Sequence, residues 1–190
     1  MHPLEKIFIP GKIRFNNVLD WFRMRIPIGA KVLLLNYSAG ESNWGCQATS
    51  KGLVRLIRKV YPGARILKRP TWFLKNKDQA RYKEMLPNSP KEFDSDILYC
   101  ISEELGLIDF DWADVIIFNG EGSVHEYKPW RAEPYLHLLE IYLAKNLFKN
   151  KKVMAVNQTV AFQDKNFGNW LKTAYQNCDY VSVREPHSLA

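Results

Sequence analysis

Polar side chains that could bind a ligand follow an apolar run near the middle of the chain. The run has the length of a buried strand and leads into residues 119–123, with the sequence NGEGS. Gly120 and Gly122 are expected to adopt positive φ and to bring backbone amides close to a bound group. Glu121 lies between them, and His125 follows. A strand that enters a glycine-rich turn is typical of ligand sites in parallel sheets, although a structural turn has the same pattern.

A second candidate region leads into a predicted helix. Residues 40–47 read GESNWGCQ and follow another apolar run. Amides at a helix start favour a phosphate or carboxylate, but the sequence matches neither the Rossmann glycine fingerprint nor the P-loop, so an ordinary connecting loop is the alternative. Cys46 is a candidate nucleophile because helix N-termini activate thiols. No catalytic partner stands near it in the sequence, which favours a small packed residue.

The third candidate region follows the last predicted strand. Arg184 leaves that strand, and its planar guanidinium can form two hydrogen bonds to a carboxylate or phosphate, although surface or ion-paired arginines are common. His125 is a candidate general acid or base, with a hydrogen-bonded loop histidine as the alternative. The sequence identifies no catalytic residue. No metal or cofactor is predicted, because the remaining histidines lack metal-ligand spacing: His2, His137 and His187.

Strands and helices that could position these regions alternate along the chain. The expected strands are 31–36, 64–67, 115–118, 152–157 and 180–183, and the expected helices are 46–61, 97–107, 131–148 (amphipathic) and 166–176. This order predicts an α/β fold with a doubly wound, mostly parallel, Rossmann-like sheet. Residues 1–30 are expected to be an irregular N-terminal segment and 31–190 one domain, with 70–95 as an inserted loop or lid.

The composition fits a single folded domain of 190 residues, because 46% of them are hydrophobic. The net charge is +7, and the basic residues are scattered. Such a surface suits anionic small molecules or peripheral association with a membrane. Since no nucleic-acid motif has the required spacing, no nucleic-acid partner is expected.

The cysteines and the N-terminus indicate the compartment. Three cysteines without a Cys-x-x-Cys pair argue against a disulfide framework or zinc site and favour a reducing environment. No apolar stretch approaches membrane-spanning length, and the N-terminus lacks the apolar core of a signal peptide. We expect a cytoplasmic protein, with the inner face of the membrane as a further location.

Taken together, the three regions resemble the N-terminal half of the polysaccharide pyruvyl transferase family. The resemblance rests on the order and spacing of the segments and covers about residues 31–190. Many members have a run of glycines where this chain has NGEG, which leaves the role of this segment open. The matching segments are 43–48 (NWGCQA), 113–123 (ADVIIFNGEGS) and 180–185 (YVSVRE) with Ser188.

The resemblance implies a fold like one half of a GT-B two-domain enzyme, with the site in a cleft between two Rossmann-like halves. It implies transfer of a pyruvyl group from phosphoenolpyruvate to a sugar hydroxyl, as a ketal on a cell-surface glycan or its lipid-linked precursor. Arg184 would help to hold the carboxylate or phosphate of the donor. The other implied site residues are Asn43, Gly45, Gln47, Gly120, Glu121, Gly122 and Ser123.

The end of the chain bears on the length of the protein, and two other functions compete with pyruvyl transfer. Ser188 is a candidate N-cap, but the sequence ends two residues later, so we expect a longer protein. The histidine that serves as the acid in the family would lie in the second half, and residues 1–190 alone are expected to have little transferase activity. The alternatives are a non-catalytic sugar- or nucleotide-binding Rossmann-like module and one half of a GT-B glycosyltransferase.

Overall fold

The computed structural model describes residues 29–70, 79–127 and 129–184, in which strands and helices alternate. The strands are β1 (Lys31–Tyr37), β2 (Arg65–Pro70), β3 (Val115–His125), β4 (Lys152–Ala161) and β5 (Tyr180–Val183). The helices are α2 (Trp44–Val60), α4 (Gln79–Met85), the short 3-10 helix η2 (Pro90–Glu92), α5 (Ser95–Glu104), α6 (Ile108–Trp112), α7 (Glu133–Leu147) and α8 (Lys165–Gln176). The expected N-terminal segment 1–30 lies almost entirely outside the described residues.

The five strands form one parallel sheet in the order β2-β1-β3-β4-β5. The chain moves outward from β1 to β2, returns to β3 beside β1, and then continues in the opposite direction. In doubly wound sheets, ligands bind beyond the carboxyl ends of the strands where this reversal occurs. The α/β, Rossmann-like fold class is confirmed, while the relation to a two-domain GT-B enzyme stays a prediction.

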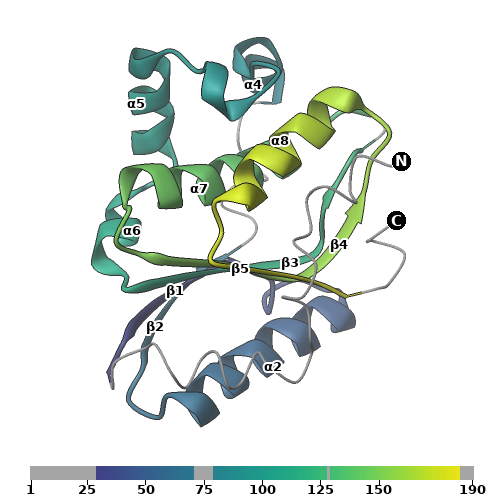
Figure 1. Cartoon of the computed structure of the whole chain (residues 1–190). Coiled ribbons are helices and arrows are strands. Elements are labelled where there is room, and N and C mark those ends of the chain that lie inside the picture. Colours follow the sequence, from purple (N-terminus) through teal and green to yellow (C-terminus); the bar gives the residue numbers. More distant parts are fainter. Residues whose placement is uncertain (1–28, 71–78, 128, 185–190) are drawn as a thin grey trace.

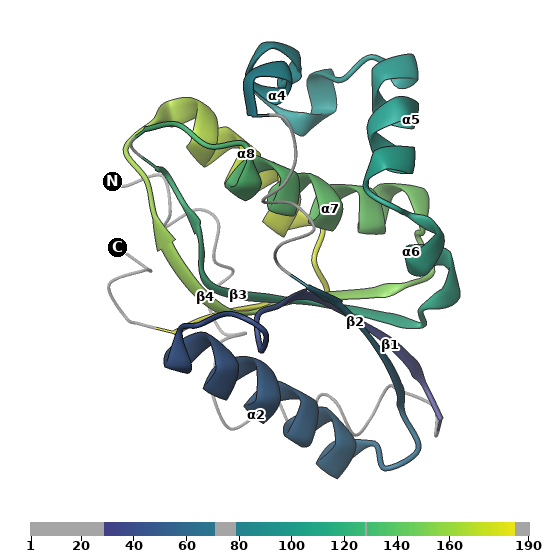
Figure 2. The same cartoon turned by 180° about the vertical axis from the view of Figure 1, so that it is seen from behind.

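Helices cover both faces of this sheet. Helix α2 packs on one face, and α7 and α8 pack on the other (Figure 1). Seen from behind, α4 and α5 lie outside α7 and α8, farther from the sheet (Figure 2). Val32 and Leu34 of β1 face α2, whereas Leu33 joins the core on the α7 side. Because both faces are covered, the central strands are continuous apolar runs.

The segment 119–123 is part of β3 and does not form a turn after it. The strand continues to His125, and its register against β4 shifts between Glu121 and Val124. The prediction of a strand-to-loop turn was wrong, because the long partner strand β4 keeps the segment in the sheet: Glu121 pairs with Gln158. A register shift of this kind changes the direction of the side chains.

Two expectations about helices are also corrected. Helix α7 was predicted to be amphipathic, but 11 of its 15 residues are buried. It is buried because a second helical layer covers its outer side. Residues 70–95 were expected as an inserted loop or lid. Of these, 71–78 lie outside the described residues, whereas 79–95 contribute α4 and η2 to that layer, and Tyr82 belongs to the core. Within the described ranges, no helix has both the length and the apolar character needed to cross a membrane.

Candidate functional site

A polar pocket of about 520 Å³ lies at the carboxyl ends of the strands, where the connection order reverses. It combines the loop after β1, the start of α2, the end of β3, the connection from β3 to α7, and the residue after β5. Its lining residues are Ser38, Glu41, Asn43, Gly45, Cys46, Thr49, Glu121, Gly122, Ser123, Tyr127, Arg131, Glu133 and Arg184. All three regions that the sequence singled out therefore meet in one pocket.

Glu121 forms the most elaborate contacts in the pocket. Its Oε1 accepts hydrogen bonds from Ser38 Oγ at 2.7 Å, Thr49 Oγ1 at 2.6 Å and Asn119 Nδ2 at 2.8 Å. Ser50 Oγ adds a longer contact of 3.3 Å to the same oxygen. The donors come from the loop after β1, from α2 and from β3, so they fix the carboxylate relative to three parts of the chain. The side chain is buried but still borders the pocket.

Side chains at the ends of three neighbouring strands are joined below the pocket. Asn36 Nδ2 donates to the backbone oxygen of Asn119 at 2.6 Å and to Ser123 Oγ at 2.8 Å. Asn157 Nδ2 donates to Asn119 Oδ1 at 3.0 Å. Asn36, Glu121 and Asn157 have φ of 55°, 47° and 59°, a conformation that costs energy in residues other than glycine. The hydrogen bonds hold these strained residues and connect Asn36 to Ser123, which lines the pocket.

The amides at the start of α2 are not open to a ligand in the way that the sequence suggested. Asn43 is the N-cap, and its Oδ1 accepts from the amides of Gly45 at 2.8 Å and Cys46 at 3.3 Å. Asn43 and Gly45 line the pocket, but Gln47 does not. Gln47 Nε2 instead donates to the backbone oxygen of Glu41 at 2.9 Å and so stabilises the loop.

The two glycines of β3 differ from their predicted roles. Neither has positive φ; the residue between them, Glu121, does. Gly120 lies against the side chain of Gln158, where a Cβ atom would collide, and it is not part of the pocket lining. Gly122 is exposed in the pocket, and an added Cβ would meet nothing within 4 Å. Only Gly122 leaves room for a ligand.

Residues between β3 and α7 form a wall that the sequence analysis did not include. The guanidinium carbon of Arg131 lies 4.6 Å from the centre of the Tyr127 ring. Burial raises the pKa of Tyr127, the charge of Glu133 raises it further, and Arg131 opposes this. The signal that could have found these residues is their position, because they follow the carboxyl end of a central strand.

The remaining candidates occupy different places. Arg184 lines the pocket, and its amide donates to the backbone oxygen of Gln158 at 2.8 Å. Cys46 also lines the pocket. His125 lies outside the lining and packs its ring 3.9 Å from that of Tyr127. In the described part of the chain, no group of three His, Cys, Asp or Glu side chains could hold a metal ion.

A larger hollow of about 860 Å³ lies elsewhere, among α5, α6 and the end of α7. Its lining is mostly apolar and includes Tyr99, Ile108 and Leu147. These elements precede β3 and β4, so the hollow is at the amino ends of the strands. The smaller pocket is the better candidate, because it brings three carboxylates and two guanidinium groups together at the carboxyl ends.

Comparison with protein families identifies a match over most of the chain. The family model described as polysaccharide pyruvyl transferase matches residues 43–190, a range that contains most of the pocket lining. No curated protein matches the chain significantly.

Proposed function

Because the chain belongs to the polysaccharide pyruvyl transferase family, we propose that its pocket serves the transfer of a pyruvyl group from phosphoenolpyruvate to a sugar. The acceptor would be a cell-surface glycan or its lipid-linked precursor. The observation that carries the proposal is the position of the pocket: the polar ends of β1, β3 and β5 meet at the point where the sheet order reverses.

The two arginines that line the pocket are suited to binding the donor. Phosphoenolpyruvate is a compact trianion at neutral pH, and Arg131 and Arg184 both line the pocket. Arginine forms paired hydrogen bonds with carboxylates and phosphates. Arg184 is exposed, so its guanidinium can approach a bound anion. We therefore assign Arg184 to the donor, as the resemblance implied.

Other residues that line the pocket are suited to a sugar. Ser38, Thr49 and Ser123 present hydroxyl groups there, and Glu121 presents a carboxylate held by four donors. Ketal formation consumes two sugar hydroxyls, which lose two protons. One proton converts the enol carbon to a methyl group, and the other leaves with phosphate. We assign Glu121 to hydrogen bonding with an acceptor hydroxyl.

Calorimetric titration of the chain with phosphoenolpyruvate and with several sugar nucleotides tests the proposal. We expect phosphoenolpyruvate to bind. Substitution Arg184→Ala should weaken that binding by about 1.5–3 kcal/mol, the scale of a hydrogen bond to a charged group. The control is Arg55→Ala, since Arg55 is exposed on α2 and outside the pocket lining. It should leave the affinity within about twofold.

Two results would contradict the proposal. Tight binding of a sugar nucleotide without binding of phosphoenolpyruvate would favour a glycosyltransferase or a nucleotide-binding module. Equal phosphoenolpyruvate affinity in the Arg184→Ala and Arg55→Ala variants would show that Arg184 does not hold the donor.

A further inference from the structure

The outer face of α2 carries basic side chains and an exposed tryptophan. The helix has 17 residues and none of them is acidic. Trp44, its first residue, is 84% exposed, although aromatic side chains of this size are usually buried in large part. The cations of the helix are all exposed as well, and none of them lines the pocket: Lys51, Arg55, Arg58 and Lys59. We term these five residues the α2 stripe.

The α2 stripe is straight and continuous along the helix. At about 100° per residue, Trp44, Lys51, Arg55 and Arg58 project within an arc of about 60°, and Lys59 lies beside them. The residues of α2 that join the core project toward the sheet instead. Because each residue adds about 1.5 Å, the line from the tryptophan to the last arginine is about 21 Å long.

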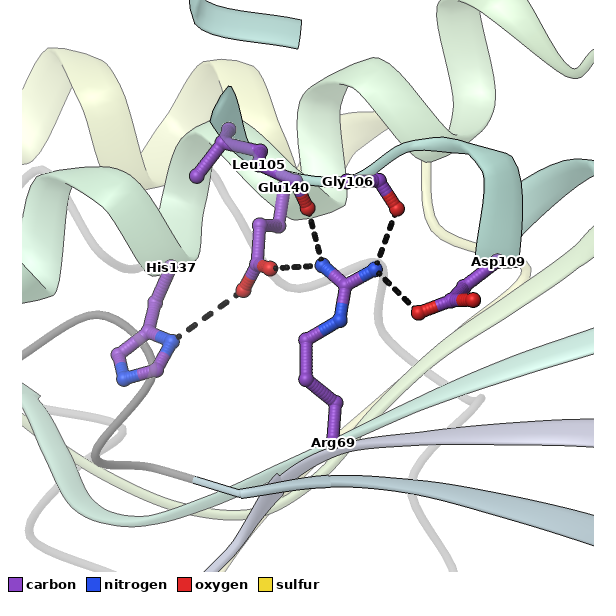
Figure 3. Close-up of polar contacts among 6 residues, drawn as sticks. All are labelled: Arg69, Leu105, Gly106, Asp109, His137 and Glu140. Atoms are coloured by element: carbon purple, nitrogen blue, oxygen red, sulfur yellow. Dashed lines mark hydrogen bonds and ion pairs between the residues drawn. The ribbon is translucent and has the colours of Figure 1, made fainter. Parts of the chain in front are cut away.

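The cations of the α2 stripe form no ion pair with any described residue. Lys51 Nζ donates to a neutral group, Gln47 Oε1, at 3.1 Å. The contrast is Arg69, whose guanidinium donates to Glu140 at 2.7 Å and to Asp109 at 3.2 Å inside the molecule (Figure 3). Along α2, spacings of three and four residues also place like charges side by side, which weakens a helix. This face is therefore suited to an external anionic partner.

The end of the helix explains only part of this charge. Arg58 and Lys59 belong to the last turn of α2, where cations stabilise the partial negative charge of the helix C-terminus. Lys51 and Arg55 lie too far from that end to have the same effect, which is confined to the last turn. The exposure of Trp44 is not explained by the helix end either.

The tryptophan points to the kind of anionic partner. Tryptophan side chains gather at the headgroup level of membranes, where one part of the ring is apolar and the other is hydrated. Lysine and arginine are attracted to anionic phospholipids at the same level. An exposed tryptophan can also stack on unpaired bases, so a single-stranded nucleic acid is the competing partner.

The position of the pocket favours the lipid surface. Asn43 and Gly45, which flank Trp44 in the sequence, both line the pocket, and Thr49 lines it one turn further along α2. A lipid-linked acceptor presents its sugar just outside the headgroups. Docking through the α2 stripe would bring the pocket to this level.

The more apolar surface at the other edge of the sheet has the wrong charge for anionic lipid. The hollow among α5, α6 and the end of α7 includes the exposed side chains of Tyr99 and Ile108. Glu103 and Asp111 also line it, and anionic headgroups would repel both. It also lies away from the pocket.

We propose that the α2 stripe docks on the surface of an anionic phospholipid membrane, with Trp44 among the headgroups and the cations against the lipid phosphates. The inference rests on the proposed function, because a lipid-linked acceptor gives the docking its purpose. It also gives the pocket an orientation, since the start of α2 then faces the membrane.

Sedimentation with vesicles of phosphatidylcholine alone, and of an equimolar mixture with the anionic phosphatidylglycerol, tests the docking. We expect the chain to bind the mixed vesicles, and high salt to weaken this binding. The double variant Lys51→Gln, Arg58→Gln should bind about 25-fold more weakly, because each cation near an anionic surface contributes about fivefold. The matched control is Lys165→Gln, Lys172→Gln, which removes two exposed cations with the same spacing from α8, on the other face of the sheet. It should stay within about twofold.

Fluorescence gives a measurement that does not depend on charge. Phospholipids with brominated acyl chains quench tryptophans that reach the membrane. On mixed vesicles, wild type should be quenched more than Trp44→Phe, since the variant lacks the tryptophan of the α2 stripe. Equal quenching of the two chains would show that Trp44 stays away from the lipid and would overturn the proposal.

Titration with phosphoenolpyruvate in the absence of lipid separates this proposal from the proposed function. The Lys51→Gln, Arg58→Gln variant should keep its phosphoenolpyruvate affinity, because neither residue lines the pocket. Vesicle binding that only this pair weakens, without any binding of phosphoenolpyruvate, would retain the docking and reject the donor. Failure to bind the mixed vesicles, or equal losses in the two double variants, would overturn the docking. Binding of polyuridylate without binding of vesicles would overturn it too, and would assign the α2 stripe to nucleic acid.

Discussion

Gly120 and Gly122 are two residues apart in β3, but a side chain added at each would meet different surroundings. A Cβ atom on Gly120 would collide with the amide group of Gln158. That amide is held in place, because Tyr175 Oη donates to its oxygen at 2.7 Å and its nitrogen donates to the backbone oxygen of Val156 at 2.9 Å. Gly122 faces open space.

We therefore expect Gly120→Ala to lower the free energy of unfolding by about 1–3 kcal/mol, the usual cost of overpacking a buried site. Neither glycine has positive φ, so the difference tests contact and not backbone strain. Gly122→Ala should stay within about 0.5 kcal/mol of wild type. Urea unfolding of both variants measures the difference. Equal stabilities would show that Gln158 moves aside at little cost.

Sequence reasoning selected residues that line the pocket, but it did not predict their backbone conformation or their hydrogen bonds. It selected Glu121 and its neighbours because glycines mark unusual backbone, but it gave the positive φ to the glycines. The conformation of Glu121 depends on donors from distant elements, Ser38 and Thr49. Such tertiary hydrogen bonds leave no local pattern in the sequence. The substrate-binding roles of these residues remain predictions.

At the scale of elements, Asp179 joins the end of α7 to the start of β4. Its Oδ2 accepts from Lys145 Nζ at 2.7 Å and from the amide of Val153 at 2.9 Å. Burial alone would raise the pKa of this carboxyl, but the hydrogen bonds and the charges of Lys145 and Lys152 lower it below its ordinary value. The folded state therefore favours the ionised form.

We expect Asp179→Asn to lower the free energy of unfolding by about 1–2 kcal/mol at pH 7, less than a fully buried charged contact because the site is partly exposed. A lowered pKa stabilises the fold above the unfolded value of about 3.9 and loses this effect as pH falls through the folded value. The difference from wild type should therefore shrink by pH 3. Denaturant unfolding at both values measures it, and a difference that is constant with pH would contradict the assignment.

The elements also show where periodicity misleads. The alternation of helix and strand predicted every strand of the described sheet, because apolar runs of strand length are distinctive. Helix α7 was predicted to have a polar face, yet Glu140 and His137 are buried on it. Glu140 pairs there with Arg69, which stands 71 residues away in the sequence. Polar residues in a helical sequence pattern are assigned to the solvent-exposed face unless a buried partner is known.

For the whole molecule, the order of the strands brings the three candidate regions together. The reversal between β1 and β3 places the start of α2 beside the end of β3, and β5 contributes Arg184 to the same edge. This meeting could be predicted, since parallel strands end at one edge. The wall of Tyr127 and Arg131 was missed, because the connection between β3 and α7 has no recognisable motif and only its position after a central strand marks it.

Arg69 is the side chain that connects the layers of the molecule. From the edge strand β2 it reaches the turn before α6, α6 itself and α7, and its guanidinium carbon lies 4.9 Å from the centre of the Phe110 ring. Replacing it with methionine keeps an unbranched apolar stem but leaves Glu140 buried without its cation. Removal of one partner of a buried ion pair usually costs about 3–5 kcal/mol.

We therefore expect Arg69→Met to be strongly destabilising, with a fall in the free energy of unfolding of about that size in urea titrations. The matched control is Arg65→Met on the same strand, where the arginine is exposed and the change should be within about 0.5 kcal/mol. Because Arg69 and Glu140 form a buried ion pair, the effect of replacing Glu140 should depend on whether Arg69 is present. Glu140→Gln removes the orphaned charge, and adding it to Arg69→Met should restore part of the lost stability. Strict additivity of the two losses would show that the two side chains act independently.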